Sequence, residues 1–204
     1  MQTMIKLEKI VRKNILDLKP YSSARDEFSG KDGVFLDANE NPFGYLNRYP
    51  DPNQKKLKRK LANLKEVGVE NIFVGNGSDE VIDLAFRIFC NPTIDKVLSF
   101  EPSYGMYEVS AAINNIELIK VPLNNNFQID LNKIEPFLKD ENIKLIFICS
   151  PNNPTGNLIL QRDIEYILNH FNGIVIIDEA YIDFAQSDSM IKLIKDYNNL
   201  IISQ

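Results

Sequence analysis

The stretch KLIFICSPNNPTG, residues 144–156, joins an apolar run to a loop of unusual composition. Its first half, KLIFIC, is nearly continuous in apolar residues, a pattern typical of a parallel strand that is buried on both faces. Its second half holds two prolines, two asparagines and a glycine, which favour a rigid and irregular loop directly after the strand. A simple turn needs fewer of these residues, so the complete string is the most specific signal in the chain.

Similar runs lie on both sides of this stretch. From about residue 70 onward, β-rich runs alternate with helical patterns. We expect strands at 71–74, 96–100, 116–121, 144–149, 174–177 and 200–203, and helices at 78–89, 104–114, 131–138, 160–170 and 189–197. Strict alternation of this kind predicts an α/β fold, in which helices sandwich a mainly parallel sheet.

The N-terminal part of the chain has a different pattern. Residues 1–20, MQTMIKLEKIVRKNILDLKP, carry apolar residues at spacings of three and four and end at Pro20, which predicts one amphipathic helix. An irregular stretch rich in Gly, Pro and Asn follows. We therefore expect residues 1–50 to form a helix, an arm and part of a smaller domain, and residues 51–204 to form the first part of a larger domain.

Composition narrows the classes of function. The 204 residues carry 23 Lys and Arg against 28 Asp and Glu, a net charge of -5, which argues against a broad nucleic-acid footprint. The sequence contains no apolar run of membrane-spanning length and no signal-peptide pattern, so we expect a cytoplasmic protein. Cys90 and Cys149 lie far apart and His170 is the single histidine, so we expect no metal site. The chemistry must then come from carboxylates, hydroxyls, amides or a cofactor.

In an open parallel sheet, ligands bind beyond the carboxyl ends of the strands. The first such junction is VGNGSDE, residues 74–80. Gly75 and Gly77 allow a tight turn, and Ser78 is a good N-cap residue with Asp79 behind it. Free backbone N–H groups at such a helix start form an anion site. An ordinary capped turn explains the same residues equally well.

The second junction is FEPSYGMY, residues 100–107. Tyr104 follows a strand end directly, where an aromatic ring could stack on a planar ligand. The alternative is that Tyr104 and Tyr107 begin a helix and pack against the sheet. Neither tyrosine decides the question alone.

The remaining two junctions supply polar groups. Asn153 lies in the loop of residues 149–156, where an amide can donate a hydrogen bond to a ligand oxygen. Asp178 closes a strand of β-branched residues, a costly place for a carboxylate unless a cation or hydrogen-bond donors meet it, and Tyr181 follows within reach. Asp178, Glu179 and Asp183 could also bind magnesium, but no phosphate-loop motif of the GxxxxGK[ST] type accompanies them.

These four junctions, in this order, resemble the fold-type I aminotransferases, which depend on pyridoxal phosphate. The resemblance implies that the backbone of Ser78 and Asp79 holds the cofactor phosphate and that Tyr104 stacks on the ring. It further implies that Asn153 and Tyr181 hydrogen-bond the ring's O3′ and that Asp178 pairs with the pyridinium nitrogen. Asp178, Tyr181 and Asn153 are thus the candidate catalytic residues.

The N-terminal third is similar to the histidinol-phosphate aminotransferase family in the strings KPYSSAR (19–25), LDANENPFG (36–44) and LNRYPDP (46–52). This resemblance implies a homodimer with shared sites, in which Tyr49 reaches the cofactor phosphate of the partner subunit. It places Tyr21 and Asn39 near the substrate. Without it, RYPDP is a proline turn and NENPFG a connecting loop.

The implied reaction moves an amino group between L-histidinol phosphate and 2-oxoglutarate, giving imidazole acetol phosphate and glutamate. Such a reaction requires a lysine, and the resemblance implies that this lysine lies beyond Gln204, so that the chain is the first part of the enzyme and inactive alone. The alternatives are a related enzyme, such as threonine-phosphate decarboxylase or an aromatic aminotransferase, and a non-catalytic binding module of the same fold.

Overall fold

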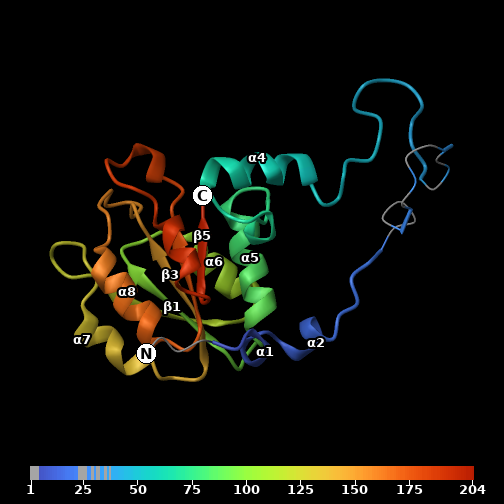
Figure 1. The fold of residues 1–204 in the computed structure, drawn as a ribbon. Helices are drawn as coiled ribbons and strands as arrows, with labels where there is room; N and C mark the ends of the chain where they lie inside the picture. Colours follow the sequence, from blue (N-terminus) through green and yellow to red (C-terminus); the bar gives the residue numbers. More distant parts are fainter. Residues whose placement is uncertain (1–4, 23–26, 29, 31–32, 35, 37) are drawn as a thin grey trace. The chain divides into compact units, whose positions relative to one another are not determined.

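The computed structural model of the chain describes residues 5–22, 27–28, 30, 33–34, 36 and 38–204 (Figure 1). It divides into two compact units. One comprises Met1–Leu16 and Gly75–Gln204, and the other comprises Asp17–Val74. Each unit is considered by itself below. The boundary near residue 50 that we expect between the domains of the whole protein stays a prediction.

The first unit is built on a five-stranded sheet with the order β2-β1-β3-β4-β5. All neighbouring strands are parallel. The strands are β1 (Lys96–Glu101), β2 (Glu117–Pro122), β3 (Ile143–Cys149), β4 (Ile174–Asp178) and β5 (Leu200–Ser203). The predicted α/β fold with a parallel sheet is therefore confirmed. The strand order reverses direction between β1 and β3, the position at which open α/β sheets bind ligands.

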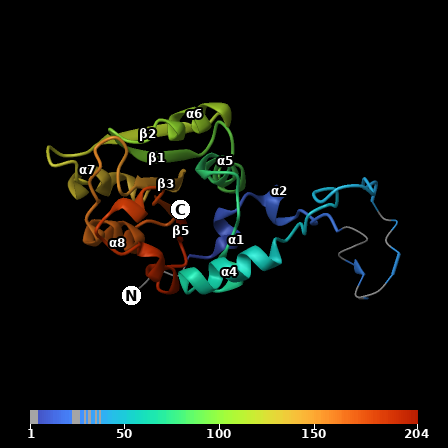
Figure 2. The same ribbon diagram turned by 90° about the horizontal axis from the view of Figure 1, so that it is seen from above.

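Helices cover both faces of the sheet, as the alternation of the buried strand residues requires. On β3, Leu145 and Phe147 belong to a core shared with α5 (Ser78–Phe89) and α6 (Met106–Ile113). Ile146 and Ile148 point to the opposite core, which contains residues of α7 (Leu131–Ile134) and α8 (Gln161–His170). Figures 1 and 2 show α5 on one side of the sheet and α7 and α8 on the other. A strand with both faces covered must be apolar throughout, which explains the sequence of β3.

Three short 3-10 helices complete the first unit: η2 (Glu135–Phe137), η3 (Ile182–Phe184) and η4 (Met190–Lys195). Two of them replace parts of predicted α-helices. The helix expected at 131–138 is α7 followed by η2, and the helix expected at 189–197 is η4 alone. None of the helices in the described ranges is both long enough and apolar enough to cross a bilayer.

The single helix predicted for residues 1–20 is wrong within its described part. The structure has two short helices, α1 (Leu7–Ile10) and α2 (Lys13–Leu16). They are separated at Val11, which is extended (φ -66°, ψ 137°). The next residue, Arg12, donates its backbone N–H to the carbonyl of Ile88 at 2.9 Å and its guanidinium to that of Arg87 at 2.8 Å. These carbonyls lie in the last turn of α5, where no helical partner remains for them, so this contact outweighs continuation of the helix.

The second unit also departs from expectation. The strand expected at 71–74 is absent, because η1 (Val69–Asn71) ends there and no strand of the described residues pairs with the extended segment that follows. An apolar run can form a strand only where a neighbour supplies the ladder of hydrogen bonds. The unit instead contains α4 (Lys55–Lys65), a Lys-rich helix for which we had no prediction.

Candidate active site

Four of the nine predicted site residues lie at the carboxyl ends of β1, β3 and β4. The first unit contains six of them, namely Ser78, Asp79, Tyr104, Asn153, Asp178 and Tyr181. The N-terminus of α5, the start of α6 and the three loops meet through hydrogen bonds and shared cavities. The following paragraphs treat these contacts from α5 to β4.

The first turn of α5 is arranged as an anion site would be. Gly77, and not Ser78 as we expected, is the N-cap residue, with φ 81° and ψ 171°. The side chain of Glu80 closes the turn by accepting bonds from the backbone N–H of Asn76 at 2.5 Å and from its amide at 3.0 Å. The first N–H groups of a helix have no partner within the helix. They start here at Ser78 and Asp79, at the positive end of the helix dipole.

Tyr104 is connected to this turn. Its hydroxyl donates to Oδ1 of Asp79 at 3.2 Å, and its ring is half-buried just before α6 begins. The ring stands edge-on to that of Tyr107, with 5.6 Å between centroids and 88° between planes. Burial, and then the charge of Asp79, raises the pKa of the Tyr104 hydroxyl. The hydrogen bond to Asp79 and the edge-on contact with Tyr107 hold the Tyr104 side chain in one orientation beside the start of α5.

Tyr107 is a site residue that the sequence did not identify as one. It is buried and stacks on Phe147 of β3, with 4.7 Å between ring centroids. This is the packing role that we considered for it. Its hydroxyl also donates to Oδ2 of Asp178 at 3.0 Å. The spacing of three residues from Tyr104, which places both on one face at the start of a helix, was the signal available in the sequence.

Asp178 is the most unusual group of the site. It is only 4% exposed. Its Oδ2 accepts from Tyr107, and its Oδ1 accepts from the backbone N–H of Ala180 at 3.2 Å. Burial raises its pKa, the bonds from Tyr107 and Ala180 lower it, and the charge of Asp79 raises it again, with a net upward shift. A carboxylate has about four lone-pair sites. The two donors leave it with acceptor capacity for a further partner.

The loop after β3 is fixed chiefly by Asn152, the neighbour of the residue that we predicted. Asn152 is buried and accepts from the Ser103 hydroxyl at 2.9 Å. Its amide donates to the carbonyl of Pro102 at 2.9 Å and to the hydroxyl of Thr155 at 2.7 Å. These bonds tie the loop after β3 to the loop after β1. Asn153 therefore lies on a rigid support.

Two cavities adjoin at these loops. One, of about 310 Å³, is lined by Asn153 and Tyr181 together with Pro154 and Phe184. The other, of about 250 Å³, is lined by Tyr104 and Tyr107 and also by Pro154. Since Pro154 borders both, the structure brings Asn153, Tyr181 and Tyr104 to one region. Tyr181 is 49% exposed.

Glu179, the residue after Asp178, makes structural contacts. It is 1% exposed, and it accepts bonds from the Ser189 hydroxyl at 2.5 Å, the Met190 N–H at 2.8 Å and the Gln204 amide at 2.8 Å. This carboxylate ties the start of η4 to the end of β5. Within the described ranges, no three His, Cys, Asp or Glu side chains are grouped so that they could hold a metal ion.

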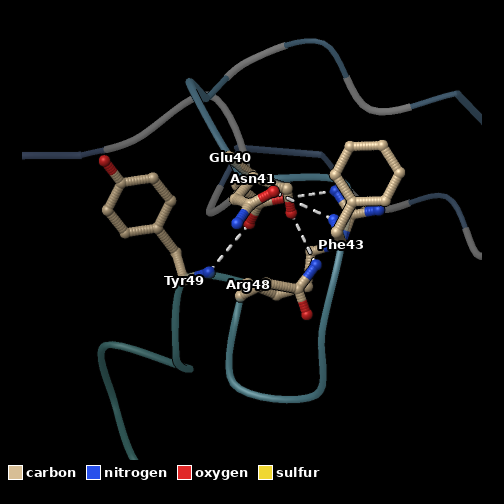
Figure 3. Close-up of polar contacts among 6 residues, drawn as sticks. Glu40, Asn41, Phe43, Arg48 and Tyr49 are labelled. Carbon is tan, nitrogen blue, oxygen red and sulfur yellow. Dashed lines mark hydrogen bonds and ion pairs between the residues drawn. The ribbon is translucent and has the colours of Figure 1, made fainter.

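The other three predicted residues belong to the second unit. There, Glu40 accepts from the backbone N–H of Tyr49 at 2.8 Å and from Arg48 at 2.7 Å (Figure 3). Tyr49 is 64% exposed. Asn39 is exposed and Tyr21 is 91% exposed. The roles of Tyr21, Asn39 and Tyr49 stay predictions.

Comparison with known proteins identifies the family. The family model described as "Aminotransferase class I and II" matches residues 29–204. The chain belongs to the class I and II aminotransferases. Two relatives named histidinol-phosphate aminotransferase come from Cytophaga hutchinsonii, 52% identical over 203 residues, and Parabacteroides distasonis, 54% identical over 199 residues. The matches cover 97% of this chain and 58% and 57% of those relatives. This aminotransferase chain thus spans less than two thirds of their length.

Solved structures give the same fold. The histidinol-phosphate aminotransferase from Clostridium acetobutylicum is 31% identical with a TM-score of 0.67, over 77% of this chain and 46% of that one. The enzyme of the same name from Sinorhizobium meliloti, solved in complex with pyridoxal-5′-phosphate, is 23% identical with a TM-score of 0.68, over 76% and 43%. At that identity the second likeness shows the fold alone.

Proposed function

We propose that the protein to which this chain belongs is a pyridoxal-phosphate-dependent aminotransferase that acts on L-histidinol phosphate and 2-oxoglutarate, yielding imidazole acetol phosphate and glutamate in histidine biosynthesis. The observation that carries this proposal is the identity of 52% to 54%, over 97% of the chain, to relatives named histidinol-phosphate aminotransferase. Because the matches span only 57% to 58% of those relatives, the activity is proposed for the whole protein.

The site residues fit pyridoxal phosphate in three respects. The start of α5 offers backbone N–H groups to a phosphate, and Gly77 leaves open space where a side chain would stand. The buried carboxylate of Asp178 retains acceptor capacity that a protonated ring nitrogen would use. Asn153, Tyr181 and Tyr104 border the adjoining cavities. The anion site complements the phosphate of the cofactor, the buried carboxylate complements its ring nitrogen, and the polar donors complement its O3′.

Each residue then has a distinct role. The N–H groups of Ser78 and Asp79 would bind the phosphate, and Tyr104 would lie against the ring. Asn153 and Tyr181 would donate hydrogen bonds to the ring's O3′, and Asp178 would keep the ring nitrogen protonated. When bound, the cofactor supplies an electron sink for the carbanion formed at the substrate. Asp178 strengthens this sink by holding a proton on the nitrogen.

The second unit and the assembly complete the proposal. We place Tyr21 and Asn39 near the substrate and Tyr49 at the cofactor phosphate of a partner subunit, in a homodimer with shared sites. The bonds of Glu40 to Arg48 and to the backbone of Tyr49 support this role, because they hold the loop while its tyrosine ring stays exposed (Figure 3). The two small-molecule substrates and the biosynthetic role favour a cytoplasmic enzyme.

A comparison of substrates tests the proposal. The full-length protein, loaded with pyridoxal phosphate, is assayed with L-histidinol phosphate, phenylalanine and threonine phosphate as separate substrates. We expect the highest kcat/KM for L-histidinol phosphate with 2-oxoglutarate as acceptor. A higher value for phenylalanine, or release of carbon dioxide from threonine phosphate as the main reaction, would refute the assignment.

A further inference from the structure

We propose that Tyr107 is a positioning residue, whose hydroxyl holds the Asp178 carboxylate in the orientation and charge state in which it meets the ring nitrogen of the cofactor. This inference rests on the proposed function of the same site. Tyr107 would not touch the cofactor itself. It would act through Asp178.

Aromatic packing holds Tyr107 in this contact. Its ring lies between two others, stacked on Phe147 at 4.7 Å and edge-on to Tyr104 at 5.6 Å. The side chain is 1% exposed, so it is almost completely shielded from bulk water. The hydroxyl lies 3.0 Å from Oδ2 of Asp178, which is itself 4% exposed. A bond between two buried groups, one of them ionised, is stronger than a bond at the surface.

The other groups around Asp178 do not replace this bond. The backbone N–H of Ala180 binds the second oxygen, Oδ1. From α5, the negative charge of Asp79 disfavours ionisation of Asp178, and from β3 the thiol of Cys149 interacts with the carboxylate as a weak and buried group. Among the described residues, Tyr107 is the side chain that donates to Asp178. It therefore opposes the burial that raises the pKa of this carboxyl.

Loss of the hydroxyl has a definite consequence. In Tyr107→Phe the aromatic stack is kept, because the change removes one oxygen from a ring held by its neighbours. The carboxylate of Asp178 then loses one of its two donors and binds a proton more readily. The proton shared with the ring nitrogen moves toward Asp178, and the nitrogen is protonated in a smaller fraction of molecules.

The test is the nitrogen-15 NMR signal of the ring nitrogen in the full-length protein, loaded with pyridoxal phosphate labelled at that atom. We expect the signal of Tyr107→Phe to move toward that of an unprotonated pyridine, and cofactor affinity to fall about tenfold, because the charged pair of Asp178 and the ring nitrogen is weakened. The matched control is Tyr166→Phe. Tyr166 lies on α8, and its hydroxyl donates to the carboxylate of Glu135 at 2.6 Å. The signal and affinity of this variant should match those of the wild type. A wild-type signal in Tyr107→Phe would overturn the inference.

Two further variants separate this role from packing. Phe147→Leu loosens the stack but keeps the Tyr107 hydroxyl, so it should lower stability and leave the nitrogen signal in place. A fluorinated tyrosine at position 107 is a stronger donor of nearly the same shape and should move the signal in the direction opposite to Tyr107→Phe. If the fluorinated protein shows no shift, the inference fails even where Tyr107→Phe does not fold. Absence of turnover with L-histidinol phosphate would refute the proposed function instead, whatever the nitrogen signals show.

Discussion

Replacement of Asp178 by Asn should stabilise the protein when the cofactor is absent. The wild-type carboxylate is 4% exposed and has two donors, Tyr107 at 3.0 Å and the Ala180 N–H at 3.2 Å. No ion pair of the described residues includes it. An Asn side chain of the same shape can accept from Ala180 and donate to the Tyr107 hydroxyl, which can act as donor or acceptor. The variant therefore satisfies both contacts and carries no buried charge.

The size of this stability difference and its dependence on pH follow from the raised pKa of Asp178. Below pH 3.8, which is the ordinary pKa of an Asp side chain, the carboxyl is protonated in the folded and unfolded states alike. Folding then buries no charge. As the pH rises from 3.8 through the raised folded pKa, the folded state retains its proton longer than the unfolded state does, so stability is lost across this window. At neutral pH we expect Asp178→Asn to be more stable by about 1–3 kcal/mol, the cost of an incompletely satisfied buried polar group.

The assay is thermal and urea unfolding of the cofactor-free, full-length protein and its variant between pH 4 and pH 8. The difference in the free energy of unfolding should be small at pH 4, grow as the pH rises, and then level off. Asp188→Asn is the control, because Asp188 is exposed and bonded to Lys192. A variant that is less stable than the wild type at neutral pH, or a difference that does not change with pH, would refute the reasoning.

Three further predictions concern neighbouring groups. With cofactor bound, Asp178→Asn should fold normally but lose turnover by orders of magnitude, because a neutral ring nitrogen is a poor electron sink; near-normal kcat would remove Asp178 from the site. Asn152→Ala should lower the free energy of unfolding in urea by about 1–3 kcal/mol, since it leaves buried partners in two loops unsatisfied; an unchanged midpoint would contradict this. Gly77→Ala should cost about 1–3 kcal/mol, because its φ of 81° and ψ of 171° lie in a region that essentially only glycine adopts. It should also weaken cofactor binding in equilibrium titrations, whereas Gly105→Ala, with φ -67°, should not show this strain.

Much of the fold follows from hydrophobic patterning. The five strands of the sheet and α5 lie at their predicted positions, with ends that differ by two residues at most. These segments are buried on one or two faces, so their apolar periodicity reflects the packing directly. The errors occur where a contact distant in the sequence decides the structure. Arg12 leaves its helix to bond the end of α5, and residues 72–74 lack a partner strand.

The positions of several candidate site residues in the fold were predictable for a similar reason. Loop composition at strand ends identified Asn153, Asp178 and Tyr104 as polar or aromatic groups at one edge of the sheet. Their supports were not predictable, because the bonds of Tyr107 to Asp178 and of Ser103 to Asn152 join residues 71 and 49 positions apart. A single sequence does not show which of two adjacent asparagines points inward.

The central claim is that the start of α5, Tyr104 and Asp178 together bind pyridoxal phosphate. The most direct test is a crystal structure of the full-length protein with this cofactor. We predict the phosphate at the N–H groups of Ser78 and Asp79, the ring against Tyr104, and the ring nitrogen within hydrogen-bonding distance of an Asp178 carboxylate oxygen. A cofactor bound elsewhere, or a ring nitrogen that faces away from Asp178, would contradict the account.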